Sequence, residues 1–311
     1  MTSYYSALFF TAFLPITVML YGMAPRRFRW AVLLLASYGF FFALSGALIA
    51  FVALSTAVVY ACARMMGANL AEKNRQLATA SSGKREIREA CKRKNRRIVF
   101  AAVVANIGIL AVLKYSGFFG LSLASALAAF GISIDLSIPS FALPIGISFY
   151  TLMAVSYVVD VYRERTKADK NLGHVALFLA FFPGIMEGPL SRYNDVAPSL
   201  IAGEPLNRKN LYAGTLRIMW GMAKKIIVAD RLNAFVKPVF DNYGSYDGGV
   251  IALAAILYTM QLYCDFSGTM DVALGMGRVF NVTLPENFRQ PFFSRTASEF
   301  WQRWHITLGL W

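Results

Sequence analysis

The chain has 311 residues, of which 57% are hydrophobic and only 15% are charged. A soluble domain averages about 45–50% apolar and about 25% charged residues, so this composition excludes an ordinary soluble protein and indicates one embedded in a lipid bilayer. The formal net charge of +14 would suit a nucleic-acid-binding protein. However, the basic residues gather in short clusters between nearly uncharged apolar segments, a pattern typical of membrane topology, so we exclude nucleic acid as a partner.

The first half of the chain predicts several membrane helices. Residues 4–23 lack a basic leader and a small-residue cleavage site, so we predict a retained helix rather than a signal peptide. Residues 30–63 are long enough for two short helices, broken near Ser45 and Gly46. The next stretch, residues 64–97, holds eleven Lys and Arg but only three Glu. By the positive-inside rule it is predicted to be a cytoplasmic basic loop, and its most hydrophilic part could instead form a charged helix.

The middle of the chain predicts further crossings of the membrane. Residues 98–115 would cross outward, residues 117–130 would lie near the far surface, and residues 143–161 would cross back. Two further basic clusters, one at residues 26–29 and one that begins at Arg163, fit the cytoplasmic side. These assignments place the N-terminus outside the cytoplasm.

Residues 175–190 are apolar but contain two breaks, Pro183-Gly184 and Gly188-Pro189. Proline removes a backbone donor, and Pro-Gly pairs favour turns. Irregular backbone at membrane depth is tolerated only where protein or water covers it. The segment is therefore either a re-entrant loop that lines a cavity or a surface loop, and Glu187 within it stays ambiguous.

Two segments follow with contrasting patterns. Residues 207–231 alternate apolar and basic residues, as an amphipathic helix along the cytoplasmic interface would. Residues 250–266 are strongly apolar and lead into a polar stretch. If that helix continues, four residues share one face: Gly268, Asp271, Gly275 and Arg278. Small residues there would let a second helix approach closely, so polar packing between helices is favoured over a reaction site.

The end of the chain carries His305, one of only two histidines. Residues 296–299 match a capping box that begins a helix. Four residues would share one face of that helix: Trp301, Trp304, His305 and Leu308. Imidazole titrates near neutrality and suits proton transfer, but a buried structural or interfacial histidine explains the spacing equally well. His174, the other histidine, is predicted to be interfacial. Asn287 and the arginines at 289 and 295 could position an anionic ligand or could form an interfacial loop.

Four ordered segments resemble the membrane-bound O-acyltransferase (MBOAT) family, in its bacterial alginate O-acetyltransferase-like branch. They are residues 144–149 with 160–163, 181–183 with 188–193, 265–268 with 285–288, and 294–308. The resemblance implies an all-α, polytopic membrane protein in which a multi-helix bundle surrounds a tunnel. It also implies one membrane-embedded domain over residues 1–311, with the acyltransferase core at 144–308.

The resemblance also implies a site. His305 matches the family's motif histidine and is the expected catalytic residue. Residues expected to bind substrate or line the tunnel are Asp265, Ser267, Asn287, Glu299, Trp301, Arg303 and Trp304. Family members carry a second histidine on a later helix, and the chain ends at Trp311 before any such helix, so we expect a C-terminally truncated, inactive fragment. Thr269 and Met270 depart from the family's usual Tyr-Ser.

The implied function is O-acyl transfer in the bacterial inner membrane. An acyl group, in the first place acetyl, would move from a cytoplasmic thioester to hydroxyls of an exported polysaccharide such as alginate. The donor would be acetyl-CoA or an acyl carrier protein, with no bound cofactor and no metal. Basic loops could attract such an anionic donor or anionic lipid. Either a histidine base activates the acceptor directly, or the acyl group passes to a periplasmic acetyltransferase partner.

Three other functions stay open. One is D-alanyl transfer to teichoic acid, which is the activity of a close branch of the same family. Another is a transporter or channel, for which broken apolar segments are typical, although no two related halves are found in the sequence. The third is a scaffold of a secretion machine, in which His305 would be dispensable.

Overall fold

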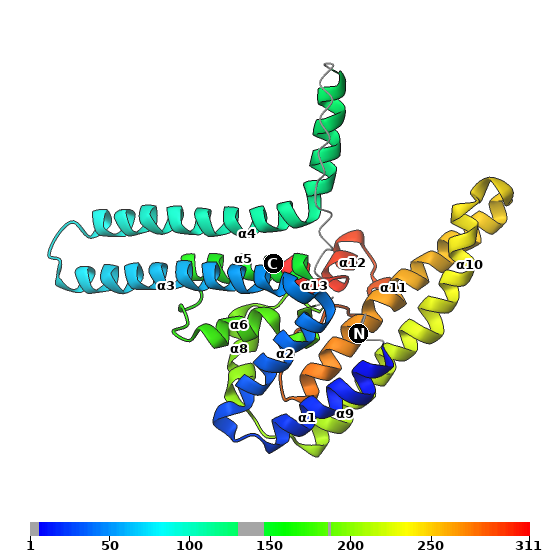
Figure 1. Ribbon diagram of the computed structural model, residues 1–311, viewed down its shortest axis with the longest axis horizontal. Helices are drawn as coiled ribbons and strands as arrows, with labels where there is room; N and C mark the ends of the chain where they lie inside the picture. Colours follow the sequence, from blue (N-terminus) through cyan, green and yellow to red (C-terminus); the bar gives the residue numbers. More distant parts are fainter. Residues whose placement is uncertain (1–5, 130–145, 186–187) are drawn as a thin grey trace. The chain divides into compact units, whose positions relative to one another are not determined.

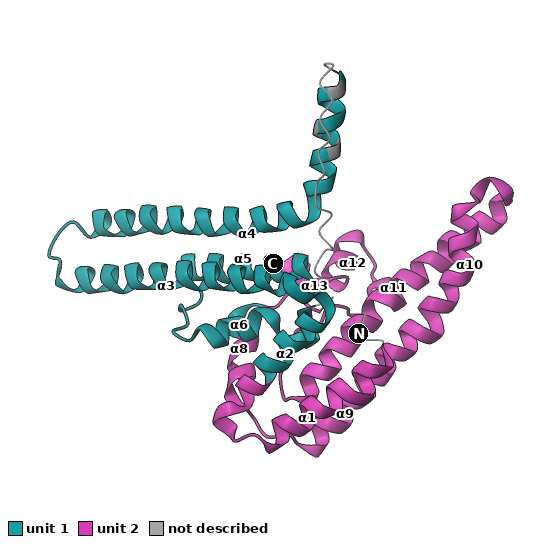
Figure 2. Ribbon diagram, in the orientation of Figure 1, with its two compact units in different colours: residues 1, 33–185, 192–194 teal, residues 2–32, 186–191, 195–311 magenta. Residues whose placement is uncertain are grey.

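The computed structural model describes residues 6–129, 146–185 and 188–311. These residues form helices joined by turns, with no β-strand among them, which confirms the all-α class. The chain divides into two compact units (Figure 2). The first comprises residues 33–185 and 192–194, and the second comprises residues 2–32, 186–191 and 195–311, each as far as it is described. The assignment of one domain around a tunnel stays a prediction.

The first unit has α3 and α4 as its longest helices (Figure 1). Its elements are α2 (Arg29–Ser45) from residue 33 onward, a 3₁₀ turn (Gly46–Leu48), α3 (Ile49–Thr79), α4 (Lys84–Ala129), α5 (Ile147–Tyr162), α6 (Leu172–Ala180) and α7 (Phe182–Ile185). Helix α3 packs against α4 and α5, and α4 also packs against α5. The predicted break near Ser45 is confirmed, because α2 ends there and Gly46 follows with a φ of 56°, a conformation that glycine adopts readily.

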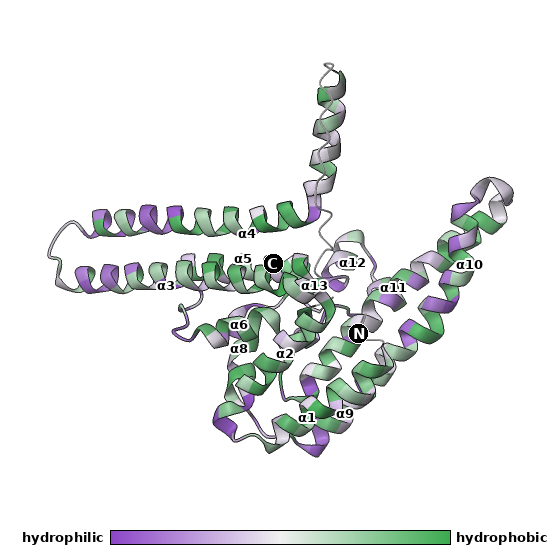
Figure 3. Cartoon of the chain, in the orientation of Figure 1, coloured by the Kyte–Doolittle hydropathy of each residue, from purple (hydrophilic) through white to green (hydrophobic). Residues whose placement is uncertain are grey.

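The basic stretch of residues 64–97 is mostly helical, which agrees with the predicted charged helix rather than with a loop. Helix α3 continues to Thr79 and α4 begins at Lys84, so only residues 80–83 form a turn. Figure 3 shows the polar ends of both helices beside this turn. Residues 117–129 continue α4 rather than forming a separate segment, although its axis bends before its end (Figure 1). That the stretch is cytoplasmic stays a prediction.

The broken segment after α5 is buried inside the first unit. Every residue from Val175 to Pro183 is buried, and α6 and α7 are separated by Phe181. The Phe182 N–H donates to Ser37 Oγ at 3.1 Å, which satisfies one backbone donor at the break. Burial of this kind excludes the surface-loop alternative for residues 175–185. Glu187 lies outside the described residues.

The second unit contains the remaining helices. They are a π-helical turn (Phe9–Phe13), α1 (Leu14–Met23), a 3₁₀ turn (Arg26–Phe28), α8 (Tyr193–Ala202) from residue 195 onward, α9 (Arg208–Met222), a π-helix (Ala223–Ala229), α10 (Asp230–Asp241), a 3₁₀ turn (Tyr243–Ser245), α11 (Gly248–Val279), a 3₁₀ turn (Pro291–Phe293), α12 (Ala297–Arg303) and α13 (Ile306–Leu310). Helix α11 packs along α9, the π-helix and α10.

Two pairs of glycines bring α9 and α11 close together. A Cβ added at Gly214 would lie 2.7 Å from the Gly275 carbonyl oxygen. One added at Gly221 would lie 2.5 Å from the Gly268 carbonyl oxygen. The close approach predicted for this face of α11 is therefore confirmed, and only glycine fits at these four positions without displacing backbone.

Among the described residues, three helical stretches are long and apolar enough to cross a membrane: Arg26–Thr79, Lys84–Leu127 and Gly248–Val279. The helices Phe9–Met23 and Ile147–Tyr162 are apolar but shorter. A bilayer core of about 30 Å needs about 20 residues of helix, which each of the three stretches exceeds. We therefore treat the chain as a membrane protein. The inner membrane and the orientation stay predictions.

Candidate active site around His305

The predicted continuous helix through His305 is wrong. Helix α12 ends at Arg303, Trp304 is extended, and His305 adopts a left-handed backbone with φ 49° and ψ 50° before α13 begins at Ile306. As a result, the residues expected on one helical face do not share one. Trp301 is exposed on α12, whereas the His305 ring packs against α11.

The physical reason is a set of backbone contacts from a segment about 20 positions earlier. The Arg289 N–H donates to the Arg303 carbonyl at 3.0 Å, and the Ile306 N–H donates to the Asn287 carbonyl at 3.0 Å. These bonds occupy groups that a continuing helix would use. Tertiary contacts therefore override the local helical pattern at Trp304 and His305.

Asn287 fixes the residues just after His305. Its side chain is buried, and its Oδ1 accepts from the Thr307 N–H at 2.9 Å and from the Thr307 hydroxyl at 2.8 Å. The Thr307 Oγ1 in turn accepts from the Leu190 N–H at 3.1 Å. Asn287 is therefore placed as a clamp on the backbone around His305.

The His305 imidazole packs against an aromatic ring, and its Nδ1 has no hydrogen-bond partner among the described residues. Its ring centroid lies 4.9 Å from that of Phe266, nearly edge to face. Its Nδ1 is buried and makes no hydrogen bond within the described part of the chain. Burial lowers the pKa of His305 below its ordinary value of 6.5, which keeps the ring neutral at pH 7. A neutral ring with a lone pair available can accept a proton.

The residues around His305 form an aromatic cluster. The Trp304 ring stacks on Phe300 at 5.6 Å and meets Phe288 edge to face at 5.0 Å. Tyr263 of α11 packs against the same two rings, Trp304 and Phe288. Trp304 is thus placed within this aromatic cluster, which is joined to the His305 ring through Phe266, because Phe266 packs against both His305 and Phe288.

Helix α12 is fixed by the predicted capping box. The Thr296 hydroxyl accepts from the Glu299 N–H at 3.1 Å, and the Glu299 carboxylate accepts from the Arg295 N–H at 2.8 Å. Glu299 also pairs with Arg303 at 2.5 Å. Glu299 and Arg303, two of the expected substrate-binding residues, are therefore bound to each other and to the helix end.

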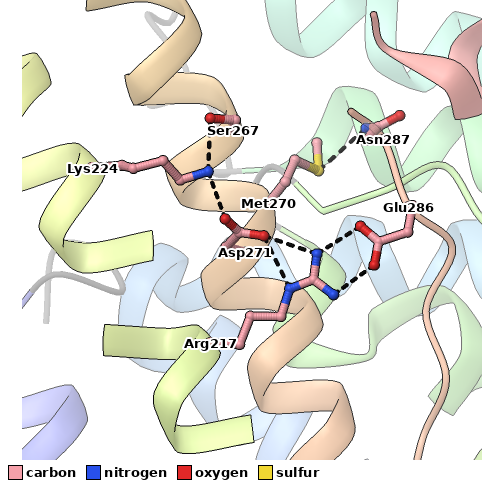
Figure 4. Close-up of polar contacts among 7 residues, drawn as sticks. All are labelled: Arg217, Lys224, Ser267, Met270, Asp271, Glu286 and Asn287. Carbon is pink, nitrogen blue, oxygen red and sulfur yellow. Dashed lines mark hydrogen bonds and ion pairs between the residues drawn. The ribbon is translucent and has the colours of Figure 1, made fainter. Parts of the chain in front are cut away.

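A second cluster, which we call the ion cluster, lies between α9 and α11 (Figure 4). Arg217 contacts Asp271 at 2.9 Å and Glu286 at 2.6 Å. Lys224 contacts Asp271 at 2.5 Å and donates to the Ser267 hydroxyl at 2.9 Å. Hydrogen bonds and charge from the two carboxylates outweigh desolvation and raise the pKa of Arg217, so this guanidinium stays charged.

The ion cluster borders a cavity of about 220 Å³ in the second unit. The cavity is also lined by Tyr263, Asn287 and Phe288, which contact or neighbour the His305 segment, and by Arg289. A polar cavity that reaches the aromatic cluster could admit a hydroxyl-bearing ligand toward this region.

Sequence reasoning missed Arg217, Lys224 and Glu286. We predicted the two basic residues on an amphipathic helix along the cytoplasmic interface. In the structure both side chains turn toward α11, because Asp271 and Glu286 supply carboxylates there. Their spacing of seven along α9 and its π-helix matches that of Gly214 and Gly221, and this shared face was the signal that could have found them.

Two predicted residues lie apart from this arrangement. Asp265 is partly exposed and pairs with Lys225 at 2.8 Å. His174, in the first unit, is partly buried, with its Nδ1 3.2 Å from Asp169 and its Nε2 3.2 Å from Asn171. Both ring nitrogens of His174 thus have polar partners, as expected of a structural histidine. The Nδ1 of His305 has no such partner among the described residues.

The chain is similar to several curated proteins. It is 34% identical over 307 residues to the probable alginate O-acetylase AlgI of Pseudomonas aeruginosa, covering 98% of this chain and 55% of that protein. It is 31% identical over 233 residues to the peptidoglycan O-acetyltransferase of Helicobacter pylori, covering 67% of this chain and 43% of that protein. It is 29% identical over 174 residues to the teichoic acid D-alanyltransferase of Bacillus subtilis, covering 54% of this chain and 43% of that protein. No family model matches the chain. The chain spans about half the length of the curated relatives it matches.

Proposed function

We propose that this chain, which belongs to the membrane-bound O-acyltransferase family, carries the proton-transfer residue of an enzyme that O-acetylates a cell-envelope polysaccharide. The observation that carries the proposal is the His305 imidazole, which is neutral, oriented by backbone contacts and partly buried, with a buried Nδ1 that is unpaired within the described residues. The activities for which the relatives are named supply the reaction class. Acetyl transfer to alginate is the first expectation, since the chain aligns with alginate O-acetylases over nearly its whole length.

The proposed reaction needs one base. A polysaccharide hydroxyl attacks the carbonyl carbon of an acetyl thioester, and His305 takes the hydroxyl proton as the new C–O bond forms. The C–S bond then breaks, and the thiolate leaves and is protonated, which yields the ester and a free thiol. The donor, acetyl-CoA or an acyl carrier protein, would reach the site from the cytoplasm. Alternatively, the acetyl group passes first to a periplasmic partner protein.

The test uses the protein expressed from its complete reading frame and reconstituted in vesicles with labelled acetyl-CoA and alginate oligosaccharide. His305→Ala should lower label transfer at least about 100-fold, because a positioned general base contributes roughly 10²–10⁴ in rate. The matched control is His174→Gln, the chain's other histidine, which should keep transfer within a few-fold. Undiminished transfer by a folded His305→Ala variant would remove the imidazole from the reaction.

D-alanyl transfer to teichoic acid is a second candidate, favoured by the 29% identity to teichoic acid D-alanyltransferases. Supplying a labelled D-alanyl carrier protein in the same vesicles separates the two donors. Solute flux across the vesicles without any label transfer would instead support a transporter.

A further inference from the structure

We propose that a cleft between α4 and α5, in the first unit, binds one anionic phospholipid, with its phosphate among arginines and an acyl chain along apolar side chains. The cleft has a volume of about 650 Å³. It is lined by four arginines: Arg93, Arg96, Arg97 and Arg163. A phosphate diester is the group that such a set of planar, multiply donating cations recognises best.

The arginines of the cleft are free of carboxylates. All four are exposed, and none forms an ion pair within the described residues. The adjacent Glu164 does not neutralise them, since it pairs with Lys73 at 2.6 Å. None of the described residues that line the cleft is acidic. Four unneutralised positive charges around one cavity favour an anionic occupant.

The floor of the cleft is apolar, which points to an amphiphile rather than a water-soluble phosphate. Its apolar lining comes from Val99, Phe100 and Val103 of α4 and from Val159 of α5. Phe100 is 69% exposed, so a large apolar surface lies open directly beside the arginines. An acyl chain would cover this surface, whereas inorganic phosphate would leave it bare.

The residues that line the cleft span the point at which each of the two helices changes between polar and apolar residues. On α4 the basic run ends at Arg97 and the apolar run begins, and on α5 the apolar run ends at Tyr162 and Arg163 follows. A phospholipid changes from charged to apolar at its glycerol backbone in the same way. Basic pockets between membrane helices at this level bind anionic headgroups.

Native mass spectrometry of the complete protein in detergent tests the proposal, with phosphatidylglycerol as the probe and phosphatidylcholine as the zwitterionic comparison. The wild type should retain phosphatidylglycerol selectively. Arg96→Gln with Arg163→Gln should weaken its binding about 25-fold, since each arginine near a membrane surface contributes about a factor of five toward anionic lipid. The control, Arg75→Gln with Lys84→Gln, removes the same two charges outside the cleft and should keep the affinity.

Two further arms distinguish the source of the phosphate. Val103→Trp narrows the apolar floor and leaves the arginines in place, so it should weaken phosphatidylglycerol binding at least fivefold even if the arginine variant fails to fold. Coenzyme A and inorganic phosphate, added as competitors, should not displace the lipid. Equal binding of phosphatidylcholine, equal weakening in the control, normal affinity in a folded Val103→Trp protein, or displacement by coenzyme A would each overturn the proposal.

Discussion

The position of the His305 imidazole is set by hydrogen bonds of the neighbouring backbone, not by hydrogen bonds of the imidazole Nδ1 itself. A left-handed conformation in a non-glycine residue costs of order 1 kcal/mol or more, and the surrounding contacts have to hold it. Asn287 supplies several of these contacts, through its carbonyl and its side-chain oxygen. The orientation of the candidate base therefore depends on a residue in another segment.

The lowered pKa of His305 leads to a prediction about pH. Burial depresses this pKa below 6.5 in the folded protein. Below about pH 6.5 the unfolded chain therefore binds a proton that the folded chain does not, and stability from this group is lost as the pH falls toward the folded pKa. Above that value the ring is neutral in both states.

Initial rates of acetyl transfer, measured from about pH 5 to about pH 8, should stay level above pH 6.5 and decline only below it. A decline that begins above neutrality would contradict the assignment.

Asn287→Ala should destabilise the protein by about 1–3 kcal/mol, because it leaves the buried N–H and hydroxyl of Thr307 without their acceptor. Thermal unfolding in detergent would measure the change. Asn242→Ala is the matched control: Asn242 is exposed, and its replacement should change stability by no more than about 0.5 kcal/mol. Equal melting temperatures for the two variants would show that the hydrogen bonds between Asn287 and Thr307 do not stabilise the protein.

For individual residues, features set by neighbours in the sequence could be predicted, whereas features set by contacts with a distant segment could not. The capping box at Thr296 and Glu299 was predictable because its partners lie three residues apart. The helix break after Arg303 was not predictable, because it is caused by backbone groups of residues 287 and 289. The sequence of residues 296–308 contains no sign of these contacts.

Among the elements, the contact of α9 with α11 depends on glycines. Gly214→Ala should destabilise the protein by about 1–3 kcal/mol, since its Cβ would meet the Gly275 carbonyl and force the helices apart. Gly108→Ala is the control, because nothing lies within 4 Å of a Cβ there. That control should be neutral or stabilising by up to about 1 kcal/mol, as expected for Gly to Ala in a helix. Thermal unfolding of both variants checks the prediction, and a Gly214→Ala variant as stable as the control would refute the packing.

The α11 side of this interface was predictable from its small-residue face, and the α9 side was not identified. Gly214 and Gly221 are spaced seven apart, as are Gly268 and Gly275, so matching the two spacings would have paired the helices. Arg217 and Lys224 follow the same spacing and would then have been placed opposite Asp271.

Across the whole molecule, composition was enough to predict helices and a membrane, but apolar length did not predict where helices end. Helices α3 and α4 continue well past their apolar runs into residues 64–97. Backbone hydrogen bonds within a helix do not require apolar side chains, and pairs such as Arg85 with Glu89 at 2.8 Å support the polar turns. Hydropathy therefore identified candidate membrane-spanning segments but underestimated the lengths of the helices.

The π-helix between α9 and α10 has a consequence for the spacing of charges. Lys224 and Lys225 are neighbours in the chain, yet they reach carboxylates six positions apart on α11, Asp271 and Asp265. Deleting one residue from Ala223–Ala229 would disrupt the i→i+5 bonds of the π-helix and change the direction in which Lys224 and Lys225 face relative to α9. Relatives that keep both lysine pairings must then conserve the number of residues in this stretch, even where the residues themselves differ.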